Sequence, residues 1–105
     1  MSKRSLDQPV RVLIVEDSRS QREFLVGMVQ AADGFAVAGT ATNGHEAITA
    51  TQRLRPEVVA MDINLPGLDG YEATRAIMQQ CPTPVVMISG DARDEEQRSV
   101  EALAV

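Results

Sequence analysis

The chain has 105 residues, a formal net charge of −5 and a pI near 4.7, with 44% apolar and 24% charged residues. This balance is typical of a globular protein, and the length suits one compact domain. Its basic residues are nine arginines and a single lysine, Lys3, in the polar N-terminal segment. The composition therefore excludes a phosphate-binding loop ending in Gly-Lys, a Schiff-base lysine and a polybasic membrane patch.

The negative charge argues against a nucleic-acid surface, which would need clustered Lys and Arg side chains facing the phosphates. No segment approaches the roughly 20 apolar residues that a membrane-spanning helix needs. The single cysteine, Cys81, cannot form an internal disulfide, which favours a reducing compartment. We therefore expect a cytoplasmic domain with no nucleic-acid and no membrane partner.

Residues 1–9 are polar and without period, so we expect a disordered leader there and one domain over residues 10–105. Val10–Val15 is rich in β-branched residues and predicts a strand buried on both faces. Ser18 can cap the helix that follows, because its hydroxyl can accept from a free amide of the first turn. Apolar residues at helical spacing predict the inward face of this helix: Phe24, Leu25, Met28, Val29 and Ala32.

A second strand and a second helix come next. Phe35–Ala41 is apolar and small, which predicts the strand. Asn43 and Glu46 have the spacing of a helix cap. The helix that they begin is expected to end before Pro56, since the residue before a proline disfavours helical backbone.

The remaining chain repeats the alternation. Val58–Met61 predicts the third strand, and Asp69 and Glu72 repeat the capping spacing at the start of the third helix. Val85–Ile88 predicts the fourth strand, and a last helix is expected over Arg93–Ala104. Alternating strands and helices, with right-handed crossovers, predict an α/β fold with a doubly wound parallel sheet.

The expected carboxyl ends of the strands carry acidic and hydroxyl side chains. Glu16 and Asp17 follow the first strand, Asp62 follows the third and Ser89 follows the fourth. Ligands of open α/β sheets bind at this edge, and the chain lacks the glycines of a dinucleotide site there. Three carboxylates repel one another unless they are neutralised, and oxygen-only ligands favour Mg²⁺. The residues therefore suggest Mg²⁺-assisted phosphoryl chemistry on an aspartate.

The chain resembles a response-regulator receiver domain from Val10 to about Leu103. The resemblance is carried by three segments, which are Val12–Ser18, Met61–Gly70 and Val86–Gly90. It implies a flavodoxin-like sheet in which the four strands are ordered 2-1-3-4. The stretch from Ile77 to Ser89, with Pro-Thr-Pro before the strand, is most similar to the regulatory half of chemotaxis methylesterases.

The resemblance also implies roles for individual residues. Asp62 would accept a phosphoryl group from the phosphohistidine of a histidine kinase. Mg²⁺ would be held by Glu16, Asp17, Asp62 and the backbone carbonyl of Asn64. Ser89 would contact the phosphoryl oxygens through its hydroxyl group. The output would be a conformational switch read by a downstream effector, with slow self-dephosphorylation and no enzymatic turnover.

The sequence departs from the family pattern after the fourth strand. A fifth strand, the lysine that follows it and a fifth helix are missing, so we expect a domain that is incomplete at its C-terminus. Lys3 is not placed to substitute for that lysine. A fourth strand with an exposed apolar edge would favour a homodimer, because open edges pair between chains.

Two alternative functions stay open at this point. One is a truncated receiver that no longer accepts phosphate and acts as a protein-binding or dimerisation module. The other is a Mg²⁺-dependent phosphatase with Asp62 as nucleophile. The phosphatase is disfavoured, because such enzymes commonly place a second acid two residues later, where this chain has Asn64.

Overall fold

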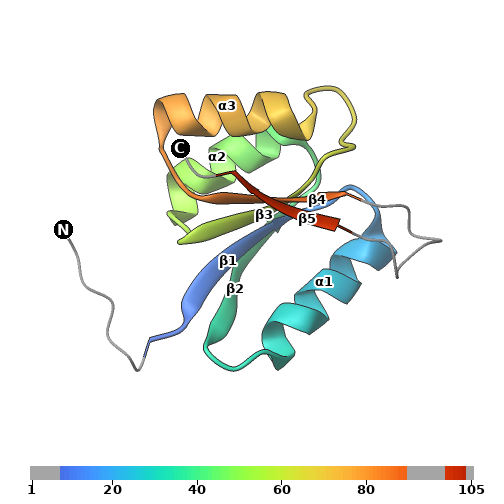
Figure 1. Cartoon of the computed structure of the whole chain (residues 1–105), viewed down its shortest axis with the longest axis vertical. Helices are drawn as coiled ribbons and strands as arrows, with labels where there is room; N and C mark the ends of the chain where they lie inside the picture. Colours follow the sequence, from blue (N-terminus) through green and yellow to red (C-terminus); the bar gives the residue numbers. More distant parts are fainter. Residues whose placement is uncertain (1–7, 90–98, 104–105) are drawn as a thin grey trace.

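A single five-stranded sheet runs through the molecule, with two helices on one face and one helix on the other (Figure 1). The structure is a computed structural model in which residues 8–89 and 99–103 are described, with side chains over 8–88. The elements in chain order are β1 (Val10–Val15), α1 (Arg19–Ala31), β2 (Phe35–Ala41), α2 (Gly44–Leu54), β3 (Val58–Asp62), α3 (Gly70–Gln80), β4 (Val85–Ser89) and β5 (Ser99–Leu103). No helix in this described part is long and apolar enough to cross a membrane.

The predicted order of the first four strands is confirmed. The sheet is ordered β2-β1-β3-β4-β5, and the pairs β1–β2, β1–β3 and β3–β4 are all parallel. Val15 lies opposite Met61 on β3, and Asp62 lies opposite Ile88 on β4. The carboxyl ends of β1, β3 and β4 therefore meet at one edge of the sheet, where the first and second halves of the fold wind in opposite directions.

The last described segment corrects two expectations. The helix predicted over Arg93–Ala104 is wrong for Ser99–Leu103, which forms β5 antiparallel to β4. Residues 93–98 and 104 of that prediction lie outside the described residues. Ser89 pairs with Ser99 and Val85 with Leu103, so the edge of β4 is covered rather than exposed. An open edge of a buried strand leaves backbone donors and acceptors unpaired, and this pairing satisfies them. The premise of a homodimer through that edge is therefore removed.

The helix starts follow the predicted capping residues, with one difference. Asp69 accepts from the amide of Glu72, whose carboxylate accepts in return from the amide of Asp69, which closes a capping box. Asn43 accepts from the amide of Glu46 at 2.8 Å. The carboxylate of Glu46, however, accepts from the amide and hydroxyl of Thr42, both at 2.8 Å. The second cap therefore also holds the residue just after β2.

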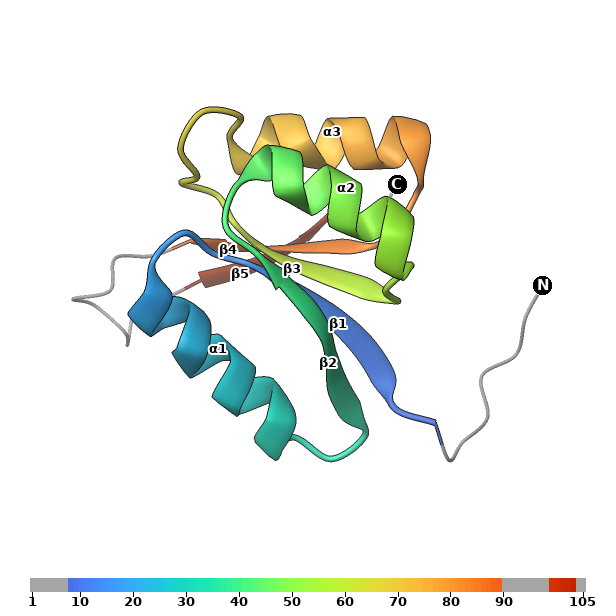
Figure 2. The same cartoon turned by 180° about the vertical axis from the view of Figure 1, so that it is seen from behind.

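The two faces of the sheet are covered unequally (Figure 2). Beneath α2 and α3 lies the larger buried cluster, which contains Leu13, Val15, Ala41, Ala47, Ala50, Val59, Met61, Leu65, Ala73, Ile77, Val85 and Met87. Beneath α1 the buried cluster consists of Val12, Ile14 and Leu25.

The inward face predicted for α1 is only partly correct. Leu25 is buried, but Phe24 and Met28 are 47% and 54% exposed. Because α1 lies alone on its face of the sheet, no second helix is described beside it to cover these two side chains. Only the narrow stripe of α1 that touches the sheet is therefore buried.

Candidate functional site

Three acidic side chains meet at the carboxyl edge of the sheet. Glu16 and Asp17 follow β1, and Asp62 is the last residue of β3. One carboxylate oxygen from each residue lies within 4.8 Å of the other two. The structure therefore brings together the three carboxylates that the sequence predicted, which come from two separate strands.

Glu16 is the buried member of this acidic cluster, with 3% of its surface exposed. Its amide donates to the carbonyl of Ala41 at the end of β2, and its carboxylate accepts from the amide of Ser18 at 3.1 Å. Burial is the main cause that raises the pKa of Glu16 from 4.5 to about 7. The carboxylates of Asp62 and Asp17 also raise this pKa, and the hydrogen bond from Ser18 opposes them.

Asp62 is held by the first turn of the loop that follows β3. Its carboxylate accepts from the amide of Asn64 at 3.1 Å. The next residue, Ile63, bonds to β4 through the carbonyl of Ile88 and accepts from the amide of Gly70, each at 3.1 Å. A Cβ atom at Gly70 would lie 2.6 Å from the carbonyl oxygen of Asp62, so only glycine allows this close approach. The loop is thus closed onto Asp62 at both ends.

The acidic cluster has the chemistry of a Mg²⁺ site. All three donors are carboxylate oxygens, the ligand type that hard cations prefer. A divalent cation would also relieve the mutual repulsion of three carboxylates at this separation. The residues present therefore fit Mg²⁺ better than a thiolate- or imidazole-binding metal.

Two further predicted residues are placed only through the backbone. Ser89 is the residue after Ile88, the partner of Asp62 on β4, and neighbouring strands lie about 4.8 Å apart. Its side chain lies outside the part of the chain whose side chains are described, so its contact to a phosphoryl group stays a prediction. Asn64 is exposed in the loop after β3, and the metal-binding role of its carbonyl also stays a prediction.

Arg22 is a residue of this region that the sequence analysis did not single out. It lies in the first turns of α1, and its guanidinium Nη1 donates to the carbonyl oxygens of Glu16 at 3.0 Å and Asp17 at 3.4 Å. A cation near a helix N-terminus is electrostatically unfavourable, whereas acids are favoured there. An arginine soon after an acid pair, at a helix start that carries no acid, was the sequence signal that could have identified it.

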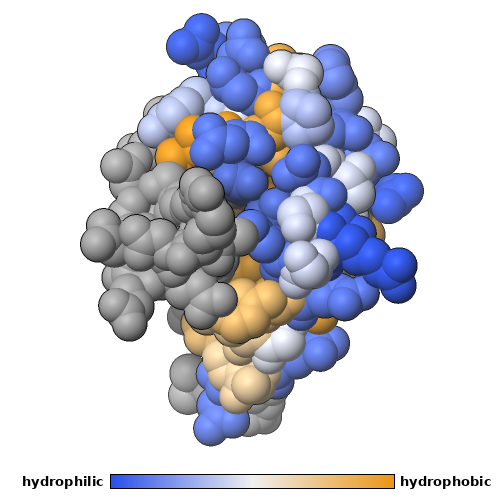
Figure 3. Space-filling model, turned by 90° about the vertical axis from the view of Figure 1, so that its right-hand side faces the viewer, coloured by the Kyte–Doolittle hydropathy of each residue, from blue (hydrophilic) through white to orange (hydrophobic). Residues whose placement is uncertain are grey.

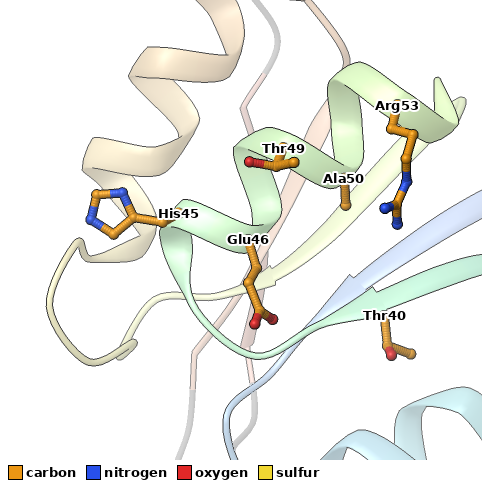
Figure 4. Close-up of a pocket in the computed structure, with 6 residues that line it drawn as sticks. All are labelled: Thr40, His45, Glu46, Thr49, Ala50 and Arg53. Atoms are coloured by element: carbon orange, nitrogen blue, oxygen red, sulfur yellow. The ribbon is translucent and has the colours of Figure 1, made fainter.

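Two cavities of the described residues lie elsewhere. One, of about 410 Å³, lies between β2 and α2 and is lined by polar side chains that include Thr40, His45 and Arg53 (Figure 4). Figure 4 shows His45 pointing away from Arg53, so these two side chains do not converge on one point. A second, of about 520 Å³, lies at the C-terminal ends of α2 and α3, beside Gln80 and Cys81. Neither cavity contains the acidic cluster, so the candidate site is the open edge of the sheet.

Comparison with known proteins agrees with this geometry. The family model described as "Response regulator receiver domain" matches residues 12–105. The chain is 46% identical over 97 residues to protein-glutamate methylesterase/protein-glutamine glutaminase 4 of Myxococcus xanthus, which covers 92% of this chain and 28% of that protein. It is 49% identical over 100 residues to the protein of the same name from Geobacter metallireducens, which covers 91% of this chain and 29% of that protein. The chain thus spans less than a third of the length of these relatives.

A solved structure shows the same likeness. The response regulator domain of Thermotoga maritima CheB matches with a TM-score of 0.76 at 37% identity, over 85% of this chain and 70% of that one. The resemblance to receivers, and to chemotaxis methylesterases in particular, is therefore confirmed as a relationship of this part of the chain. With the family model, the four parallel strands and the acidic edge in agreement, the chain belongs to the response regulator receiver family of two-component signalling proteins.

Proposed function

We propose that Asp62 accepts a phosphoryl group from the phosphohistidine of a histidine kinase, and that the chain is a signalling switch and not a turnover enzyme. The observation that carries this proposal is the meeting of three carboxylates within 4.8 Å at the carboxyl ends of β1 and β3. Glu16 is buried, whereas Asp62 is partly exposed and Asp17 is exposed. Of the two carboxylates that a second protein can reach, Asp62 is the one to which the resemblance to receivers assigns the acceptor role.

The transfer is a displacement at phosphorus. One carboxylate oxygen of Asp62 forms the new O–P bond as the N–P bond of the phosphohistidine breaks. The imidazole leaves as a neutral ring, because its other nitrogen already carries a proton. Mg²⁺, held by Glu16, Asp17, Asp62 and the carbonyl of Asn64, would supply positive charge to the phosphoryl oxygens. The hydroxyl group of Ser89 would donate a hydrogen bond to one of the same oxygens.

Incubation of the chain with Mg²⁺ and acetyl phosphate tests the acceptor. Intact-mass spectrometry is expected to show the mass gain of one phosphoryl group, which is lost in Asp62→Ala. Asp33→Ala, which removes an exposed aspartate in the turn before β2, is the matched control and should retain the adduct. An adduct that survives in Asp62→Ala would show that the assignment of Asp62 is wrong.

The output partner is proposed from the relatives. Both curated relatives are named methylesterase/glutaminase, and this chain matches less than a third of each. We propose that phosphorylation of Asp62 regulates an effector of that class. Reading the coding sequence beyond Val105 tests this, since an adjoining methylesterase segment is expected there; an effector of another class would contradict it.

The second candidate is a receiver that binds partners without accepting phosphate. Its support is that the described residues contain no lysine, because the only lysine of the sequence is Lys3. The guanidinium of Arg22, beside the acidic cluster, already donates to two backbone carbonyls. Absence of the adduct in the wild type, together with retained binding to the kinase, would favour this function over the first.

A further inference from the structure

We infer that Arg22 is a positioning residue, which holds the turn between β1 and α1 so that the Glu16 and Asp17 carboxylates face Asp62. The inference rests on the proposed metal site and concerns how the chain builds it. The backbone of Arg22 is fixed in the first turn of α1, because its amide donates to the carbonyl of Ser18 at 2.8 Å. Its half-buried side chain then returns over the turn that precedes the helix.

The guanidinium group meets the backbone of the two residues that supply the acid pair. Nη1 lies 3.0 Å from the carbonyl oxygen of Glu16 and 3.4 Å from that of Asp17. A charged donor makes hydrogen bonds about twice as strong as a neutral one, and a planar guanidinium fixes their direction. The peptide groups after Glu16 and Asp17 are therefore restrained in orientation, and with them the directions in which the two carboxylates leave the chain.

The turn needs such a restraint because its side chains repel. One carboxylate oxygen from each of Glu16, Asp17 and Asp62 lies within 4.8 Å of the other two, so their negative charges repel one another. Repulsion of this kind favours opening of the turn, which would move the acid pair away from Asp62. On the other side, hydrogen bonds from Thr42 are the main cause that lowers the pKa of Glu46, and the positive charge of Arg22 adds a smaller contribution in the same direction. The charge of Arg22 therefore also acts on the turn after β2.

A purely electrostatic role of Arg22 makes the opposite prediction about Mg²⁺. Removal of the positive charge that lies against the backbone of Glu16 and Asp17 would tighten the binding of a cation, since the local potential becomes more negative. Removal of a positioning residue would weaken it, because the ligands lose their preorganised geometry. The sign of the change therefore separates the two roles.

The test is a titration of the full chain with Mg²⁺, in which isothermal titration calorimetry measures the affinity. Arg22→Gln is expected to weaken the Mg²⁺ affinity by about tenfold, the lower end of the range for residues that orient metal ligands. Arg22→Lys keeps the charge without the planar fork and should lie between the wild type and Arg22→Gln. The matched control is Arg19→Gln, which removes the same charge from an exposed pair with Glu23 on the same helix, and it should not weaken the binding. Unchanged or tighter binding in Arg22→Gln would overturn the inference.

A second measurement does not depend on the metal. The amide of Ser18 donates to the Glu16 carboxylate, so its solvent-exchange rate, measured by NMR, reports where that carboxylate points. Several-fold faster exchange is expected in Arg22→Gln and not in Arg19→Gln. Equal rates in the two variants would overturn the positioning role. Failure of the wild type to bind Mg²⁺ would instead contradict the proposed metal site, and the exchange rates would still decide the role of Arg22.

Discussion

The two faces of the sheet hold the two halves of the candidate site by different forces. Under α2 and α3, twelve buried side chains form one cluster, and the loop that carries Asp62 is closed onto it through Leu65 and Gly70. Under α1, three buried side chains form a smaller cluster. The turn that carries Glu16 and Asp17 leads into α1, and it is held mainly by hydrogen bonds from Arg22 and to Ala41.

The surface of α1 shows the same inequality. Phe24 and Met28 remain about half exposed on this helix. Figure 3 shows a light orange, apolar patch low on the face in view, with further apolar atoms higher on the same face. Apolar packing therefore positions Asp62, the proposed phospho-acceptor, whereas polar contacts position the acid pair. Packing is insensitive to pH, while hydrogen bonds to ionisable groups depend on it. The predictions below separate these two kinds of support.

The largest expected effect is loss of packing under α3. Ile77 is fully buried in the larger cluster, so Ile77→Ala should lower the free energy of unfolding by about 2–5 kcal/mol. Phe24→Ala on α1 should lower it by less than about 1 kcal/mol, because that side chain is about half exposed. Urea unfolding followed by circular dichroism measures both. Equal losses in the two variants would contradict the difference between the faces.

The next effect concerns the buried carboxyl group of the acid pair. The pKa of Glu16 is raised from 4.5 to about 7, so the folded state binds more protons than the unfolded state between these values. Stability without metal therefore falls as pH rises through this window, by up to about 3 kcal/mol. Glu16→Gln should match the wild type near pH 4 and be the more stable protein at pH 8. Urea unfolding at several pH values measures this difference, and a constant difference would contradict it.

Glu46→Gln serves as a control of opposite sign. Hydrogen bonds from the Thr42 amide and hydroxyl lower the pKa of Glu46 in the folded state. Its ionised form therefore stabilises the protein above the unfolded-state pKa, and this contribution is lost as pH falls through the folded-state pKa. Glu46→Gln should be less stable than the wild type at pH 7 and should approach it in acid. If the stability difference from the wild type changed with pH in the same direction in Glu16→Gln and in Glu46→Gln, the pH dependence would arise from other groups.

The elements predicted from the sequence are those whose signals are local. Four strands and three helices were predicted from the periodic spacing of apolar residues and from helix-capping residues. Asp69 and Glu72 form the capping box that their spacing predicts. The exposure of Phe24 and Met28 could not be predicted, because it depends on whether a second helix lies beside α1. The strand at Ser99–Leu103 was also missed. The spacing of its residues fits a helix, and this local pattern does not show that the free edge of β4 is available for pairing.

The site was predictable to the extent that strand ends define it. Residues at the carboxyl ends of β1 and β3 must meet at one edge of a parallel sheet, so the cluster of Glu16, Asp17 and Asp62 followed from the order of the elements alone. Arg22 was missed because its contact is made by a long side chain returning over a turn, which residue spacing does not specify. The rise in the Glu16 pKa was missed as well, because burial at a strand end depends on the neighbouring loops.

A smaller effect is expected for the glycine that closes the Asp62 loop. A methyl group at Gly70 would lie 2.6 Å from the carbonyl oxygen of Asp62 and 2.7 Å from the terminal methyl of Met87. Gly70→Ala should therefore lower the free energy of unfolding by about 1–3 kcal/mol, because the backbone neighbour cannot move aside cheaply. It should also reduce phosphorylation by acetyl phosphate, since the displaced backbone belongs to Asp62. An unaltered unfolding curve would show that the loop is not closely packed.

The smallest effect is expected on the other face. Gly27 lies inside α1 and has no atom within 4 Å of where a Cβ would lie, so Gly27→Ala meets no steric obstacle. Alanine loses less backbone entropy than glycine on folding, and the change should stabilise the protein by about 0.5–1 kcal/mol. Gly34→Ala is the matched control, with equally open space but a φ of +86° that strains an L-residue, and it should destabilise. Because neither position is crowded, opposite signs in urea unfolding would show that backbone conformation, and not packing, decides substitutions around α1. Destabilisation by Gly27→Ala would instead mean that α1 is packed as closely as α3.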